Sequence, residues 1–345
     1  MYKILFIFAS LYALTLATSA KSYDLKNASQ YFEDFIRQYD KQYANETEKY
    51  ARFQIFKTNL EEVNQINEES VNSTGARAFF DITEFMDLTA EEFASRYTGL
   101  GPDDELHDIL RQSQCRQLTD NDIPDSQAPE TLDWRQQNVV TPVKNQGSYC
   151  QSCYSFSTTG HLEGQMARKY SKLLSLSEQQ IVDCDNRSYG CRGGFMVNSL
   201  MSIMELGGIM RGSDYPYTER QGRCRFNQGG VVAKVTDCYA YRLRSQEKLK
   251  HLLYKTGPVA IAVKANGFQK YKGGVMPDAH CNDGPVNHAV LLVGYGTDPR
   301  SGPYWLVKNS YGTQFGEQGY FRMQRGERAT SCGLMNDHMV TASIA

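Results

Sequence analysis

Apolar residues recur at helical spacing from Ser29 to about Asn67, in a segment that is rich in charge and contains no Gly or Pro. Five of these residues fall on one helix face: Tyr50, Phe53, Phe56, Leu60 and Val63. The pattern predicts two helices, separated near residues 43–45.

The pattern weakens after this helical segment. A short β-like stretch, AFFDITEF at residues 78–85, precedes a helix start at DLTAEEF, where Thr89 stands three residues before Glu92 as in a capping box. Residues 99–130 then lack sustained periodicity and collect Gly, Pro, Asp and Gln, which is typical of an exposed linker.

A second core is predicted from Thr131 onward, where Gly, Tyr and Cys become more frequent. Its first long helix should begin at Ser152 or Cys153 and run to about Tyr170, and a second should follow Ser177, as its cap, in SLSEQQIVDC. Four later stretches have the pattern of strands: VAIAVKA, AVLLVGYG, YWLVKN and YFRM. Helices followed by strands predict an α+β fold with a helical subdomain at about 131–235, a β subdomain at about 236–345 and a cleft between them.

The chain begins with the pattern of a secretory signal peptide, which we place at residues 1–20. Lys3 precedes an apolar run from Ile4 to about Ala17, and small residues follow at the cleavage positions. This run is too short for a membrane anchor and no later segment is apolar enough to span, so we expect a soluble mature protein. Its expected location is the secretory pathway, then a lysosome-like acidic compartment or the extracellular space. Four Asn-x-Ser/Thr triplets are candidate glycosylation sites in such a protein: Asn27, Asn45, Asn72 and Asn186.

Composition limits the classes of function. The chain has 345 residues, 41% of them hydrophobic, and a formal net charge of −2, which suits two or three globular domains. Neither a basic run nor a basic helix face is present, so we expect neither nucleic acid nor an anionic membrane as a partner.

The cysteines carry the first chemical signal. Their number, nine, is odd, so in an oxidising compartment at least one thiol has no partner within the chain. Cys150 and Cys153 lie in the stretch QGSYCQSCYSF, and this spacing suits a redox pair, two metal ligands, or a structural half-cystine beside a nucleophile. No second pair of ligands follows at finger-like spacing, so we expect no metal and no cofactor.

Cys153 stands where a nucleophile is expected, because a helix N-terminus and a nearby imidazolium both favour the thiolate. A cysteine nucleophile also needs a base, a partner that orients the base, and donors for the oxyanion. His288 in VNHAVLLVGYG can be the base, Asn309 in YWLVKNSYG can hold its tautomer, and Gln146 can donate to the oxyanion.

Other polar residues are interpreted as structural. The remaining histidines lack such neighbouring motifs and are taken as ordinary side chains: His107, His161, His251, His280 and His338. Glu163 and Lys308 are interpreted as a buried ion pair that joins helix to β subdomain, with two solvated charges as the alternative.

The chain resembles the papain-like cysteine proteases in five segments, which occur in the family's order and at compatible spacing: NQGSYCQSCYSF, LSEQQIVDCD, YGCRGGFM, NHAVLLVGYG and YWLVKNSYGTQFGEQGY. The resemblance covers nearly the whole chain. Further stretches look most like the cathepsins of insect baculoviruses: SYDL, YFEDFI, TDCYAY and EKLKHLLYKTGPVAIAV. The leader resembles the family's inhibitory propeptide at Glu48, Arg52, Phe56, Asn59, Val63 and Asn67.

The resemblance implies an endopeptidase that acts on protein substrates and is made as a zymogen. A helical propeptide at residues 21–112 would inhibit a mature, monomeric, papain-like peptidase domain at residues 113–345. Release of the propeptide is expected between about Leu100 and Cys115.

The resemblance also implies a set of disulfides and a substrate pocket. The expected pairs are Cys150 with Cys191, Cys184 with Cys224, Cys281 with Cys332, and Cys115 with Cys238, which leaves Cys153 as the free nucleophile. Substrate backbone would lie against Gly193 and Gly194, whose missing side chains permit close approach. The pocket for the second residue before the scissile bond would be walled by Phe195, Met196, Ala262, Val286 and Ala289. Asp337 would form its floor and would let the pocket accept Arg as well as apolar side chains.

The chain departs from the family pattern at several positions. Gln146 and Cys153 are seven apart where the family has six, so Tyr149 is in effect inserted. Three positions where the family has Trp are occupied here by Tyr154, Tyr311 and Phe315. These departures leave open a second reading, a papain-like binding module with weakened catalysis, and the Cys150 and Cys153 spacing leaves open a third, a secreted thiol oxidoreductase.

Overall fold

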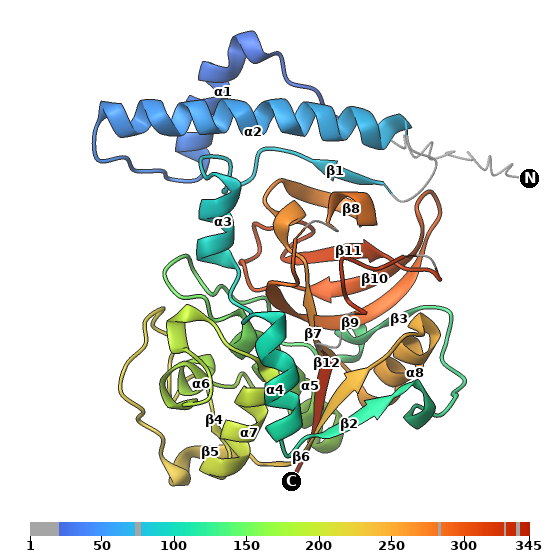
Figure 1. The fold of residues 1–345 in the computed structure, drawn as a ribbon. Coiled ribbons are helices and arrows are strands. Elements are labelled where there is room, and N and C mark those ends of the chain that lie inside the picture. The colour runs from blue at the N-terminus through green and yellow to red at the C-terminus, as the bar shows by residue number, and fades with distance from the viewer. Residues whose placement is uncertain (1–20, 73–76, 282–283, 328, 336–338) are drawn as a thin grey trace, which may run out of the picture.

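The computed structural model describes residues 21–72, 77–281, 284–327, 329–335 and 339–345. Figure 1 shows their fold, with the leader drawn in blue and teal. The predicted signal peptide lies outside the described residues, as do Asp337 and His338. None of the helices within the described ranges is long and apolar enough to cross a membrane.

The leader forms two helices, as the pattern predicted. A short 3-10 turn, η1 (Leu25–Asn27), leads into α1 (Ala28–Gln38), and α2 (Glu46–Asn72) follows after a break. Aromatic rings fill the space between the helices, with the Phe32 and Phe56 centroids 5.3 Å apart. Polar residues of α2 tie it to the chain that follows, because Asn59 Nδ2 donates to the carbonyl oxygens of Met86 and Leu88, both at 2.9 Å.

The leader then crosses to the rest of the molecule. β1 (Ala78–Phe80) pairs antiparallel with β8 (Tyr271–Met276), so only the first residues of the predicted β-like stretch form a strand. α3 (Ala90–Tyr97) follows, and Thr89 and Glu92 form the predicted capping box at its start. Figure 1 shows α3 descending from the long α2 helix towards the helices of the second core.

The prediction of an exposed linker at residues 99–130 was wrong. This region contains α4 (Asp103–Gln112), β2 (Arg116–Thr119) and the 3-10 turn η2 (Asp120–Asp122). Leu106 and Leu110 are buried in one apolar cluster with Phe195 and Met196. The helix escaped prediction because it is short and its other faces are charged, so its apolar stripe is limited to two turns.

The predicted helices of the second core are present. α5 (Cys153–Tyr170) and α6 (Glu178–Cys184) begin where the sequence indicated, and the Ser177 side chain caps α6 by accepting from Gln180 N. The other elements of this region are η3 (Trp134–Gln137), η4 (Gly190–Arg192), α7 (Met196–Leu206), β4 (Ile209–Met210), η5 (Gln228–Gly230) and β5 (Val231–Ala233).

A large mixed sheet forms the other half, and the four predicted strands belong to it. Among the described residues the strand order is β1-β8-β11-β10-β9-β7-β12-β6-β2, and β3 also pairs with β9. The strands not yet given are β3 (Leu132–Asp133), β6 (Val235–Arg242), β7 (Val259–Val263), β9 (His288–Asp298), β10 (Gly302–Lys308), β11 (Tyr320–Gln324) and β12 (Met339–Ile344). The connecting segments include α8 (Gln246–Thr256), η6 (Asn266–Phe268) and η7 (Asp278–His280).

Two large apolar cores, a smaller cluster of Leu291, Val293 and Leu306, and four disulfides hold the described parts together. One core joins the leader helices to the strands around β9, and the other packs α4, α5 and α7 against β6 and β12. The disulfides among the described residues are the four pairs implied by the resemblance: Cys115 with Cys238, Cys150 with Cys191, Cys184 with Cys224, and Cys281 with Cys332.

Candidate active site

Cys153 is the free cysteine of the described chain and the first residue of α5. Cys150, three residues earlier, is bonded to Cys191. The two thiols of QGSYCQSCYSF therefore do not form the redox pair considered from the sequence, and the structure leaves Cys153 as the nucleophile candidate.

His288 and Asn309 come from neighbouring strands. His288 begins β9 and Asn309 follows the end of β10, and β9 and β10 pair antiparallel, so the two residues meet at one edge. His288 Nε2 lies 2.7 Å from Asn309 Oδ1. Asn309 Oδ1 also accepts from Ser310 N at 2.8 Å, which identifies it as the oxygen. Because an amide oxygen only accepts, Nε2 carries the hydrogen and Nδ1 has the free lone pair.

The second ring nitrogen of His288 is available for proton transfer. His288 Nδ1 is buried and has no hydrogen-bond partner among the described residues. Burial lowers the pKa of His288 to about 4, against the opposing effect of the hydrogen bond to Asn309. The imidazole is therefore neutral over most of the pH range, with its lone pair on the nitrogen that Asn309 does not engage.

Cys153 is more enclosed than the sequence indicated. Its side chain is buried, and burial raises the pKa of the thiol to about 12, although neighbouring backbone N–H groups act in the opposite direction. The sequence predicted a helix start that favours the thiolate. The difference arises because the leader segment of residues 97–101 lies over the site.

This covering segment makes backbone contacts on both sides of the site. Gly99 N and Leu100 N both donate to Asn287 O at 3.0 Å, and Gly194 N donates to Gly99 O at 3.0 Å. A Cβ on Gly193 would lie 2.6 Å from Gly99 O, so this close approach requires glycine. Gly193 and Gly194, expected to hold substrate backbone, hold the leader in this structure.

Gln146 donates to a carbonyl of the same segment. Its Nε2 lies 3.1 Å from Tyr97 O, and its Oε1 accepts from Ser310 Oγ at 2.7 Å. Tyr311 OH donates to the same Tyr97 oxygen at 2.8 Å. The predicted oxyanion donor therefore points at a carbonyl oxygen. The roles of Tyr97 and of the Tyr311 hydroxyl were missed, because nothing local in the sequence shows which leader carbonyl reaches the site.

Aromatic residues shield the His288 to Asn309 hydrogen bond. The Tyr311 ring lies 4.8 Å from the imidazole, centroid to centroid, and Phe315 lies 5.3 Å from Tyr311. Tyr154 is buried in α5 and donates to Gly190 O at 2.9 Å. The three aromatic residues that replace Trp thus remain packed around the site.

The predicted apolar pocket is filled by the leader. Its five wall residues are buried and share one apolar cluster with Cys153: Phe195, Met196, Ala262, Val286 and Ala289. Leu100 packs against that cluster, and a Cβ on Gly101 would lie 2.3 Å from the Phe195 ring. The proposed floor, Asp337, lies outside the described residues.

The predicted ion pair between Glu163 and Lys308 was wrong in its pairing. Glu163 Oε1 lies 2.6 Å from Lys144 Nζ, and Lys144 also pairs with Glu178 at 2.5 Å. Lys308 instead donates to Thr141 Oγ1 at 3.0 Å, and burial lowers its pKa to about 8. The sequence could not resolve this arrangement, because Lys144 lies in a loop with no periodic pattern and is closer to the carboxylate.

Comparisons with known proteins find relatives over nearly the whole chain. Residues 128–342 match the family described as papain family cysteine protease, and residues 32–93 match the cathepsin propeptide inhibitor domain. Viral cathepsin of Orgyia pseudotsugata multicapsid polyhedrosis virus is 43% identical, over 94% of this chain and 95% of that protein. Viral cathepsin of Autographa californica nuclear polyhedrosis virus is 41% identical over the whole of both chains.

Solved structures of similar proteins include proforms. The digestive procathepsin L2 proteinase from the larval midgut of Tenebrio molitor has a TM-score of 0.82 and 33% identity, with 92% of this chain and 99% of that one covered. The recombinant stem bromelain precursor has a TM-score of 0.77 and 33% identity, with 92% and 98% covered.

Proposed function

Because the chain belongs to the papain family of cysteine proteases and carries a cathepsin propeptide inhibitor domain, we propose that Cys153, His288 and Asn309 hydrolyse peptide bonds once the propeptide is removed. The observation that carries this proposal is the 2.7 Å contact between His288 Nε2 and Asn309 Oδ1, which fixes a neutral imidazole in one tautomer. The free thiol of Cys153 belongs to the same buried site.

The mechanism uses these groups in two stages. His288 Nδ1 takes the thiol proton and the Cys153 thiolate attacks the scissile carbonyl carbon, while Gln146 and the Cys153 backbone N–H hold the oxyanion. His288 then protonates the leaving amine as the C–N bond breaks, which leaves a thioester on Cys153. Water attacks the thioester and gives a proton to His288, the C–S bond breaks to release the carboxylic acid product, and His288 returns its proton to the Cys153 sulfur.

The propeptide inhibits by occupying the cleft. Tyr97 presents its carbonyl to Gln146, and Leu100 packs against the apolar pocket, so substrate cannot enter. Burial also keeps Cys153 in its protonated, less nucleophilic form. Release of the segment re-exposes the helix N-terminus to water and lowers the thiol pKa.

We also propose a substrate preference and a location for the enzyme. The pocket of Phe195 and Met196 would take Leu, Val or Phe at the second position before the scissile bond, and Asp337 would add tolerance for Arg. The predicted signal peptide, the disulfides and the exposed side chains of Asn27, Asn45 and Asn186 support a secreted, glycosylated enzyme that acts in an acidic compartment or outside the cell, and we propose that it is a monomer.

One experiment separates an enzyme from a binding module with the same fold. The purified proenzyme is activated in acid and titrated with an epoxide that alkylates active-site cysteines. Stoichiometric labelling at Cys153 together with loss of peptidase activity is the expected result. Correctly folded mature protein that is neither labelled nor active would contradict the proposal.

A further inference from the structure

The loop that precedes Cys150 contains the extra residue of this chain. Tyr149 is 86% exposed, so its side chain does not anchor the loop. Yet the loop connects Gln146, the proposed oxyanion donor, to the Cys150 to Cys191 disulfide. Motion of this loop would therefore shift the Gln146 side chain relative to Cys153.

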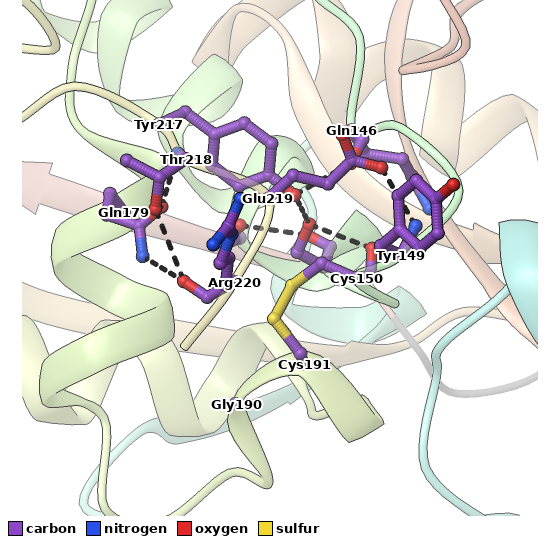
Figure 2. The surroundings of a disulfide bond; sticks show 12 residues. Gln146, Tyr149, Cys150, Gln179, Gly190, Cys191, Tyr217, Thr218, Glu219 and Arg220 are labelled. Atoms are coloured by element: carbon purple, nitrogen blue, oxygen red, sulfur yellow. Dashed lines mark hydrogen bonds between the residues drawn. A yellow bond between two sulfur atoms is a disulfide. The ribbon is translucent and has the colours of Figure 1, made fainter. Parts of the chain in front are cut away.

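One carboxylate oxygen accepts hydrogen bonds from two backbone N–H groups of this loop. Glu219 Oε1 accepts from Ser148 N at 2.5 Å and from Tyr149 N at 2.8 Å. Gly147 has φ +73, and a Cβ there would lie 1.9 Å from Glu219 Oε1. The loop is thus closed tightly around one acceptor, as Figure 2 shows.

The segment that carries Glu219 is itself fixed to α6. Gln179 Oε1 accepts from Thr218 N at 2.7 Å, and Gln179 Nε2 donates to Arg220 O at 2.7 Å, so one amide holds the backbone on both sides of Glu219. Glu219 has φ +57, a conformation that non-glycine residues rarely adopt and that persists only where the surroundings impose it.

A second residue of the same segment contacts Gln146 directly. Tyr217 OH donates to Gln146 O at 2.7 Å and lies 2.6 Å from Ser152 Oγ, the residue just before Cys153. Tyr217 therefore bridges the backbone of the oxyanion donor and the start of α5.

We propose that Glu219 and Tyr217 are positioning residues that hold the longer loop so that Gln146 Nε2 stays at the oxyanion site. This inference rests on the proposed function and adds to it a specific dependence of catalysis on the side chains of Glu219 and Tyr217. Glu219 touches neither substrate nor the reacting atoms, and it acts only through the loop.

The test compares variants of the mature, acid-activated enzyme. Glu219→Ala removes the acceptor, and the freed N–H groups can bind water, because the loop is at the surface. We expect kcat/KM for a peptide amide to fall roughly 10- to 100-fold, as for a misplaced oxyanion donor. A peptide aldehyde, whose adduct with Cys153 needs the oxyanion site, should bind more weakly by a similar factor. Alkylation of Cys153 by an epoxide needs no oxyanion and should stay within about threefold of wild type.

Three controls give the test its specificity. Glu219→Gln keeps Oε1, the atom that accepts both bonds, and should stay within about threefold of wild type. Arg220→Ala changes an exposed neighbour whose side chain makes none of these contacts and should leave all rates unchanged. The double variant of Gln146→Ala with Glu219→Ala should be no slower than Gln146→Ala alone, because both changes remove the same donor.

Tyr217→Phe is a second variant for the case in which Glu219→Ala does not fold. It removes one hydroxyl and keeps the ring, and we expect a roughly 3- to 10-fold loss of kcat/KM with unchanged alkylation. Unchanged amide hydrolysis in both variants would overturn the inference. So would a parallel fall of hydrolysis, alkylation and melting temperature, or additive losses with Gln146→Ala. A wild-type enzyme that is neither active nor alkylated would overturn the proposed function, and this inference with it.

Discussion

Individual residues of the site are held in a neutral, covered state. Burial raises the pKa of Cys153 to about 12 and lowers that of His288 to about 4, so thiol and imidazole are both uncharged between these values. We therefore expect an ion pair between them to form when the leader segment leaves and water reaches the site. In the zymogen the thiol of Cys153 is thus protonated and the imidazole of His288 is neutral.

Replacement of Cys153 tests its assignment as the nucleophile. Cys153→Ser exchanges one buried sulfur for oxygen, so peptidase activity should disappear while the melting temperature changes little. If activation is autocatalytic, the purified variant should also accumulate as uncut proenzyme, which electrophoresis after acid treatment would reveal. Efficient self-maturation of this variant, free of other proteases, would contradict the assignment.

His288 and Asn309 should differ in the size of their effects. His288→Ala removes the proton carrier and should lower kcat by about 10³-fold or more, as expected for loss of a general acid and base. Asn309→Ala leaves the imidazole in place and removes only the partner that orients it, so a loss of about 10- to 100-fold is expected. Equal losses in steady-state kinetics would show that these roles are misassigned.

The specificity pocket gives a further residue-scale prediction. Asp337→Ala should lower kcat/KM about tenfold for a substrate with Arg at the second position before the scissile bond, as expected for loss of a partly buried charge pair. The matched Leu substrate should be nearly unaffected. A uniform effect, or none, would place Asp337 outside the pocket.

Elements with long, regular patterns could be predicted from the sequence, and those fixed by distant partners could not. The apolar stripe of α2 and the apolar runs of β7, β9 and β10 are long enough for their hydrophobic pattern alone to predict helix or strand. Leu106 and Leu110 are the buried residues in the part of α4 whose side chains are described, and their partners in the apolar cluster lie about ninety residues later, at the start of α7. The same limit hid the Lys144 pairing and the Glu219 contact, which depend on loops brought together by the fold.

The α4 helix should contribute to keeping the zymogen closed. Leu106 and Leu110 pack in the cluster that contains Phe195 and Cys153, and each Leu→Ala change costs about 2–5 kcal/mol in a well-packed core. The double variant of Leu106→Ala and Leu110→Ala should therefore speed epoxide labelling of Cys153 in the uncut proenzyme at neutral pH by at least about tenfold. Arg111→Ala, on the exposed side of α4, is the matched control, and equal labelling rates in all three proteins would show that α4 is dispensable.

At the scale of the whole molecule, we expect charged groups of the leader to set the pH dependence of propeptide release. Arg52 Nη1 lies 2.6 Å from Glu92 Oε2 and also donates to Asp87 O at 3.0 Å, so it joins α2 to the start of α3. The hydrogen bond from Arg52 is the main reason why the pKa of Glu92 lies below its ordinary value of 4.5. Glu84 acts in the opposite sense, because burial raises its pKa and protonation in acid relieves that cost.

Glu92 should therefore help to set the pH at which the zymogen activates. A carboxyl group whose pKa is depressed in the folded state adds stability above its ordinary pKa and loses it as the pH falls through the folded value. Glu92→Gln imitates the protonated state at every pH, so the midpoint of autocatalytic processing should move upward by roughly half to one pH unit. The midpoint is read from processing rates between pH 3 and 7, with Glu61→Gln, an exposed carboxylate of α2, as control. Coincident profiles for wild type, Glu92→Gln and Glu61→Gln would mean that acid opens the leader through other groups.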